Sequence, residues 1–238
     1  ELSALDQAVE RFEVLLKAGR SDDARAAIAE AEKLAPNDVR VIDYLFVIAL
    51  NEGNTARYVE LAKKAAELNI DQMNGLLYQA RIELVEGRDR EAVLTLERAV
   101  KLNEYLPSVR RLLAQAYMRV GRIKEALESY QRAYEGKPDD VATARDYAMA
   151  LVGANQGEKA LSVISPKTGV LQFSPNDESL VRIWLDLEAR FGDRAAAVRI
   201  RAERFEADPT QLDNALALNT LYIEDKNWDG SRAIIDAI

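Results

Sequence analysis

Arginines are the residues whose spacing in this 238-residue chain most suggests chemistry. Arg111, Arg145 and Arg182 recur through its middle, although acidic residues outnumber basic ones and the formal charge is −8. A guanidinium group presents parallel N–H donors that match a carboxylate or a phosphate. We therefore expect ionic recognition of an acidic group.

Covalent and metal-assisted catalysis find little support in the residue types. The chain has no His and no Cys, which excludes Ser-His-Asp and Cys-His arrangements and zinc sites built on imidazole or thiolate. No P-loop, dinucleotide fingerprint or calcium-loop pattern occurs. The 40 Asp and Glu residues could in principle supply an acid–base pair, but solvated helix faces are their more common use. We expect no enzyme activity, no cofactor and no metal.

The composition also limits the classes of ligand that the chain could bind. Apolar residues make up 48% of the chain, enough for a sizeable core, and the pI is near 4.9. An acidic chain without a basic tract argues against nucleic acid and anionic membranes as ligands. We also expect no membrane insertion within this segment, because no run of about 18 apolar residues occurs. The start at Glu1 and the apolar end AIIDAI suggest an excised part of a longer protein, with a processed leader as the alternative explanation of the missing Met.

The elements that would position the arginines are helical hairpins. Apolar residues at helical spacing lie on both sides of a Gly-Arg break within 107–140, and a Pro ends that segment. Positions 7, 8, 11, 15, 20, 24, 27 and 32 of this 34-residue segment hold mainly small, aromatic or turn-forming residues: Leu113, Ala114, Tyr117, Gly121, Ala126, Tyr130, Ala133 and Pro138. The pattern resembles the tetratricopeptide repeat (TPR). An ordinary helical hairpin in a bundle is the alternative interpretation.

The same frame extends over the whole chain. The predicted repeats are 5–38, 39–72, 73–106, 107–140, 141–177, 178–211 and an incomplete 212–238. The fifth is three residues too long, and Pro166 and Pro175 predict a loop or irregular turn over Lys167 to Asn176. The expected fold is all-α: a single α-solenoid domain over 1–238, with about seven TPR hairpins. The resemblance further implies a right-handed superhelix with the first helices lining its concave side.

In the family that this chain resembles, positions 2, 5, 9, 12 and 13 of the first helices usually face the concave groove. Position 5 holds Arg111, Arg145 and Arg182 in successive repeats, which predicts a row of guanidinium groups. The candidate groove residues are Arg81, Arg111, Gln115, Met118, Arg119, Arg145, Met149 and Arg182. Alternatively, the arginines pair with acids on neighbouring first helices or are merely solvated, and the methionines belong to the core.

The resemblance implies a non-catalytic scaffold that binds a protein or peptide segment, here an acidic one, in its groove. The Ala-rich, Cys-free chain looks like bacterial members of the family that assist assembly or export complexes, so the bacterial cytoplasm, periplasm and envelope all remain open. Two other interpretations stand beside this one. The chain could be the substrate-presenting arm of a larger enzyme such as a glycosyltransferase, or it could self-associate through uncapped ends.

Overall fold

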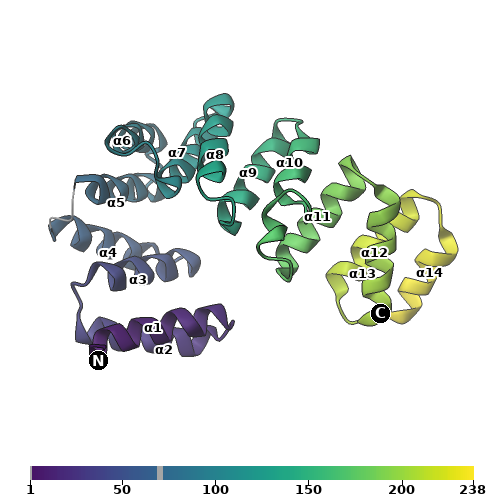
Figure 1. Ribbon diagram of the computed structural model, residues 1–238, viewed down its shortest axis with the longest axis horizontal. Coiled ribbons are helices and arrows are strands. Elements are labelled where there is room, and N and C mark those ends of the chain that lie inside the picture. Colours follow the sequence, from purple (N-terminus) through teal and green to yellow (C-terminus); the bar gives the residue numbers. More distant parts are fainter. Residues whose placement is uncertain (1, 69–71) are drawn as a thin grey trace. The chain divides into compact units, whose positions relative to one another are not determined.

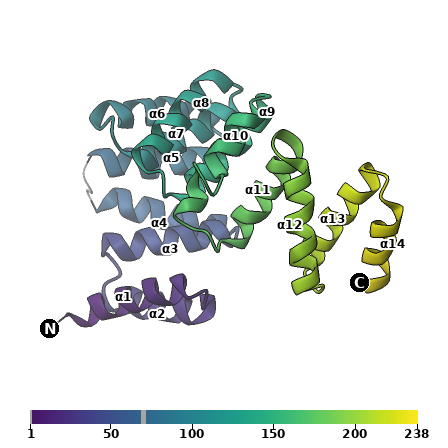
Figure 2. The ribbon, with the colours of Figure 1, turned by 45° about the vertical axis from the view of Figure 1, so that its right-hand side comes forward.

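The computed structural model describes residues 2–68 and 72–238, which form helices joined by turns and contain no β-strand (Figures 1 and 2). They divide into two compact units, Glu1–Val120 and Gly121–Ile238. The all-α solenoid class expected from the repeat pattern is confirmed. A single continuous superhelix would have to include both units, and it stays a prediction.

In the first unit, helices of similar length follow one another closely. They are α1 (Ala4–Lys17), α2 (Ser21–Leu34), α3 (Val39–Asn51), α4 (Thr55–Glu67), α5 (Gln72–Val85), α6 (Asp89–Leu102) and α7 (Pro107–Arg119). The second unit contains α8 (Ile123–Gly136), α9 (Val141–Gly153), α10 (Gly157–Ile164), the short 3₁₀ helix η1 (Val170–Gln172), α11 (Glu178–Phe191), α12 (Arg194–Ala207), α13 (Leu212–Glu224) and α14 (Trp228–Ala237).

Small residues on the second helices allow close packing. Ala24 and Ala31 on α2 are buried against a cluster that includes Phe12 on α1 and Val41 on α3. The corresponding alanines of later hairpins are buried as well: Ala92, Ala99, Ala126, Ala133, Ala160 and Ala197. A methyl group at these positions lets two helices approach while it still fills the contact. The first two cores therefore each draw on one hairpin and the first helix of the next.

The turns between paired helices share a left-handed residue at repeat position 15, except in the sixth hairpin, where Gly192 has a φ of −128°. Gly121 has a φ of +77° at repeat position 15, and the glycines of the first three hairpins are also left-handed. Asn155 and Lys226 hold the same repeat position with φ values of 58° and 57°. A Cβ atom makes this conformation costly, which explains why Gly predominates at the turn.

The fifth hairpin departs from the regular pattern, as its prolines predict. Helix α10 ends at Ile164, and η1 follows after a turn. Val170 and Leu171 of η1 are buried, so the irregular segment packs onto its own hairpin. The predicted interruption over Lys167 to Asn176 is confirmed.

Candidate protein-binding surface on the first helices

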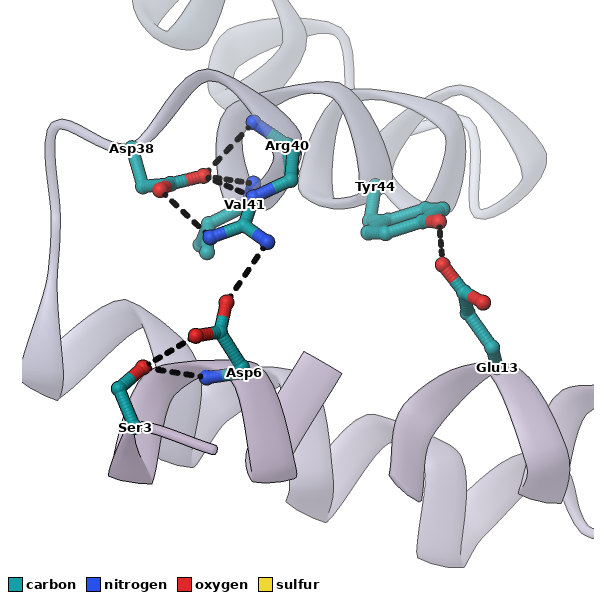
Figure 3. Close-up of polar contacts among 7 residues, drawn as sticks. All are labelled: Ser3, Asp6, Glu13, Asp38, Arg40, Val41 and Tyr44. Atoms are coloured by element: carbon teal, nitrogen blue, oxygen red, sulfur yellow. Dashed lines mark hydrogen bonds and ion pairs between the residues drawn. The ribbon is translucent and has the colours of Figure 1, made fainter. Parts of the chain in front are cut away.

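In the first unit, polar side chains join the first helices of successive hairpins. Arg40 on α3 donates from Nη1 to Asp6 Oδ1 on α1 at 2.9 Å and from Nη2 to Asp38 Oδ2 at 3.1 Å (Figure 3). Ser3 donates to the other Asp6 carboxylate oxygen at 2.6 Å. The Ser3 hydrogen bond and then Arg40 hold the pKa of Asp6 below its usual value. Asp6 is therefore already engaged at this surface.

Two tyrosines make similar connections. Tyr44 on α3 donates its hydroxyl hydrogen bond to Glu13 on α1 (Figure 3). Tyr78 on α5 donates to Asp43 Oδ1 on α3 at 2.6 Å. Burial, and then the bond to Glu13, raise the pKa of Tyr44 to about 12. Glu13 and Asp43, at predicted groove positions, therefore accept hydrogen bonds from the next first helix, which reduces their capacity to repel an acidic ligand.

Arg81 and Arg119, both predicted groove residues, are engaged within the first unit. The Arg81 guanidinium lies over the Phe46 ring, 4.7 Å from its centroid. Arg119 Nη1 donates to the Leu84 carbonyl oxygen near the end of α5 at 2.6 Å and lies 3.2 Å from Asp89 Oδ1. A cation is stabilised at the carbonyl end of a helix. Arg119 thus contributes to packing between α5, α6 and α7.

The remaining predicted residues are divided between the units. Arg111, Gln115 and Met118 lie on α7 of the first unit and are partly buried. Arg145 and Met149 lie one turn apart on α9 of the second unit, and Met149 is 65% exposed. This exposure favours a surface role for Met149 over a core role. The complete row of arginines spans both units, and it stays a prediction.

Arg182 on α11 has a partner on the next first helix. Its Nη1 donates to Asp213 Oδ2 on α13 at 2.5 Å. Both side chains are largely exposed, and exposed ion pairs contribute little to stability because water screens them. The alternative of pairing between first helices is therefore correct for Arg182. Within the second unit, Arg145 has no carboxylate partner among the described residues.

An open cleft of about 600 Å³ adjoins Arg182. Its walls come from α11, α12 and the beginning of α13, and its lining includes the arginines Arg182, Arg201 and Arg204 and the acids Glu178 and Asp213. Arg201 and Arg204 were not among the predicted residues, because they lie on the second helix α12. The sequence nevertheless contains a signal for them. They place charged residues at repeat positions 24 and 27, where the fourth repeat has the aromatic Tyr130 and the small Ala133.

Acidic side chains can form metal sites or lie buried as carboxylates. The described residues contain no group of three or more acidic side chains placed to hold a metal ion. Glu83 is buried, but Gln79 Nε2 donates to it at 2.9 Å and Arg88 lies 3.7 Å away. Both contacts engage Oε1, and the buried Oε2 has no hydrogen-bond partner among the described residues. No helix within the described ranges is long and apolar enough to span a bilayer.

Paired helices, left-handed turns and buried alanines define a TPR-type helical repeat protein. A sequence model of the family described as "Bacterial transcriptional activator domain" matches residues 2–143, more than half of the chain, and the protein belongs to that family. No protein with a curated description matches the sequence.

Solved structures share the fold at low identity. A thermophilic TPR protein of Thermus thermophilus is 17% identical, with a TM-score of 0.65 over 77% of this chain and 98% of that one. The Cut9–Hcn1 hetero-tetramer of the APC/C contains a chain that is 14% identical, with a TM-score of 0.66 over 91% of this chain and 42% of that one. At these identities the likeness concerns the fold alone.

Proposed function

We propose that this chain is a non-catalytic scaffold that binds a segment of a partner protein on its first helices. The observation that carries this proposal is the surface of α9, where Arg145 lies beside the exposed side chain of Met149. A cation next to an exposed apolar side chain suits a segment with acidic and apolar residues, and methionine adapts to varied apolar partners.

The second unit offers further support on its other first helices. Leu216 on α13 is exposed at the repeat position that corresponds to Arg145. Among the described residues, Arg182 on α11 pairs with Asp213 in an exposed ion pair, which an incoming carboxylate can replace at little cost. The partner segment would therefore meet both charge and apolar area, and binding would weaken as salt is added.

The family description supports a setting in bacterial transcription activation. With a formal charge of −8, we expect the chain to contact proteins of that machinery, since DNA binding requires a basic surface. This setting is favoured over the envelope assembly or export complex that the residue composition suggested, because the family matches residues 2–143.

A charge-reversal experiment tests the scaffold proposal. Arg145→Glu together with Met149→Glu places two carboxylates on one face of α9, without touching the buried core. In co-purification from cells that express tagged protein, the double variant should lose the partners that the original chain retains. Those partners are identified by mass spectrometry.

A matched control is available on the second helix α6, where Leu94 and Arg98 are exposed and also lie one turn apart. Leu94→Glu with Arg98→Glu should retain every partner. Both double variants should keep the helical circular dichroism spectrum. If the α9 variant is folded and retains the same partners as the original chain, the proposed surface is wrong.

A further inference from the structure

Arg201 holds a charge at a position that is apolar in other hairpins. Its side chain on α12 occupies repeat position 24, which is Leu96 in the third hairpin, Tyr130 in the fourth and Ile164 in the fifth. Like those residues it is buried, with 1% of its surface exposed. A buried guanidinium loses its hydration, and this loss is costly unless its N–H groups find partners.

The contacts of Arg201 leave this requirement partly unmet. Nη2 donates to Asp186 Oδ1 on α11 at 2.5 Å, and Nη1 reaches Asn214 Oδ1 on α13 at a long 3.4 Å. Nε is buried and has no hydrogen-bond partner among the described residues. Buried polar atoms in proteins are almost always bonded. Arg201 therefore brings a donor without a partner to the lining of an open cleft.

Two further arginines line the same cleft. Arg204 on α12 replaces the small residue of repeat position 27, where the first four hairpins have buried alanines, and it pairs with Glu178. Arg182 pairs with Asp213. Both carboxylates are at the solvent boundary, with side chains 70% and 74% exposed. These exposed partners can rotate away, so both guanidinium groups are available for exchange.

The beginning of α13 adds donors to the same place. Gln211 precedes the helix without capping it, because its side chain donates to Asp208 Oδ2 at 3.2 Å. The first N–H groups of a helix lack partners within it, and with the helix dipole they attract anions. Leu212, Asp213 and Asn214 form this first turn and line the cleft.

We propose that the cleft between α11, α12 and α13 binds a carboxylate group, with Arg201 beside it and Arg182, Arg204 and the first turn of α13 as further donors. That the carboxylate belongs to a partner segment, as an acidic side chain or a chain terminus, rests on the proposed function. Phosphate and carboxylate share much chemistry, but the cleft already holds Glu178 and Asp213. Their charge disfavours a dianion more than a single carboxylate.

Binding of defined peptides to the full ¹⁵N-labelled chain, followed by NMR, tests this proposal. One probe is acetyl-Glu-Leu-Glu-Leu-amide, with side-chain carboxylates only. A second is acetyl-Gln-Leu-Gln-Leu with a free C-terminal carboxylate, and a third is the neutral amide of that second sequence. At least one carboxylate probe should bind about tenfold more tightly than the neutral one, the worth of one charge-assisted hydrogen bond. The tighter carboxylate probe identifies the source.

The position of the site is read from individual signals. The Arg201 Nε–H signal and the backbone amides of 212–214 should shift with the carboxylate probe, while those of the exposed Arg199 on α12 should not. Equal affinity for charged and neutral probes, or shifts confined to other helices, would overturn the proposal.

Variants separate binding from a purely structural role of Arg201. Arg201→Leu restores the residue type of Leu96, so it should abolish the preference for charged probes without lowering the melting temperature. Arg204→Gln, at a less buried side chain, should weaken the preference severalfold, whereas Arg199→Gln should leave it unchanged. If Arg201→Leu melts lower and the original chain does not distinguish the probes, Arg201 is only a link between helices.

This outcome is independent of the scaffold test. Arg145→Glu with Met149→Glu acts on α9, which does not line the cleft. If that variant loses its partners while no carboxylate probe binds, the scaffold stands and the cleft proposal fails. If the probes bind as expected and that variant keeps all its partners, the cleft proposal stands and the scaffold surface is wrong.

Discussion

Tyr44 on α3 donates its phenolic hydroxyl to the carboxylate of Glu13 on α1, and so joins the first helices of two successive hairpins (Figure 3). The next step along the first unit repeats this arrangement, with Tyr78 on α5 donating to Asp43 on α3 at 2.6 Å. Acidic residues at predicted groove positions thus connect neighbouring hairpins of the first unit.

Removing the hydroxyl should weaken this connection. Tyr44→Phe should lower the free energy of unfolding by about 1–1.5 kcal/mol, the usual net contribution of a hydrogen bond. Because the acceptor Glu13 is charged, we expect the upper end of this range. Urea denaturation measures the change. Tyr105→Phe is the matched control because Tyr105 is almost fully exposed. Equal effects of the two substitutions would contradict a stabilising role for the Tyr44–Glu13 bond.

The same substitution should change how stability depends on pH. The pKa of Tyr44 is raised to about 12, first by burial and then by Glu13, whereas an unfolded tyrosine titrates near 10. Above pH ~10 the unfolded state therefore loses a proton that the folded state keeps, which favours unfolding. The stabilisation by Tyr44 should be complete below pH ~10 and be lost as pH approaches ~12. A stability difference between the original chain and Tyr44→Phe that stays constant over this window would contradict the prediction.

Bulk at the small packing positions should be costly. Ala126 on α8 is fully buried, and Ala126→Leu should destabilise the protein by about 1–3 kcal/mol because a packed contact has no room for three more carbons. Thermal or urea melts give the change. Ala195→Leu on α12 places the same side chain at an exposed position and should change stability little. A melting temperature of Ala126→Leu within about a degree of the original would show that the repeat frame is misassigned.

The turn of the last hairpin can be improved. Lys226 has a φ of 57° at the position where the first four hairpins have Gly. Lys226→Gly should raise the free energy of unfolding by about 0.5–1 kcal/mol, because relief of the left-handed strain exceeds the added flexibility of the unfolded chain. Lys226→Ala retains the Cβ atom and should give no such gain. If the two substitutions have the same effect, strain at this turn is negligible.

Gly169, in the irregular segment of the fifth hairpin, should not tolerate a side chain. A Cβ atom there would lie 2.1 Å from the Val163 carbonyl oxygen and 2.3 Å from its carbon. Backbone atoms cannot move aside easily, so Gly169→Ala should cost about 1–3 kcal/mol by overpacking. Gly153→Ala meets no atom within 4 Å and should leave stability unchanged or raise it. Similar melting temperatures for the two variants would indicate that the segment adapts freely.

Much of this architecture was predictable from sequence because its signals are local. The glycine at position 15 determines a turn through the conformation of one residue, as Gly121 illustrates with its φ of +77°. Pro166 ends α10 because its ring cannot continue a helix. Alanines at fixed spacing predict which helix faces meet, and their burial at Ala126 and Ala133 agrees. These features depend on a residue and its near neighbours along the chain.

The candidate site depends on tertiary structure. The sequence alone established which arginines stand on first helices, but the partner of Arg182 is Asp213, on the next first helix. Arg201 and Arg204 were not predicted, because the resemblance placed the groove residues on first helices. Packing of α11, α12 and α13 brings them to one cleft. Side chains distant in sequence meet only through that packing, so only the tertiary structure decided which charges are paired and which buried donor lacks a partner.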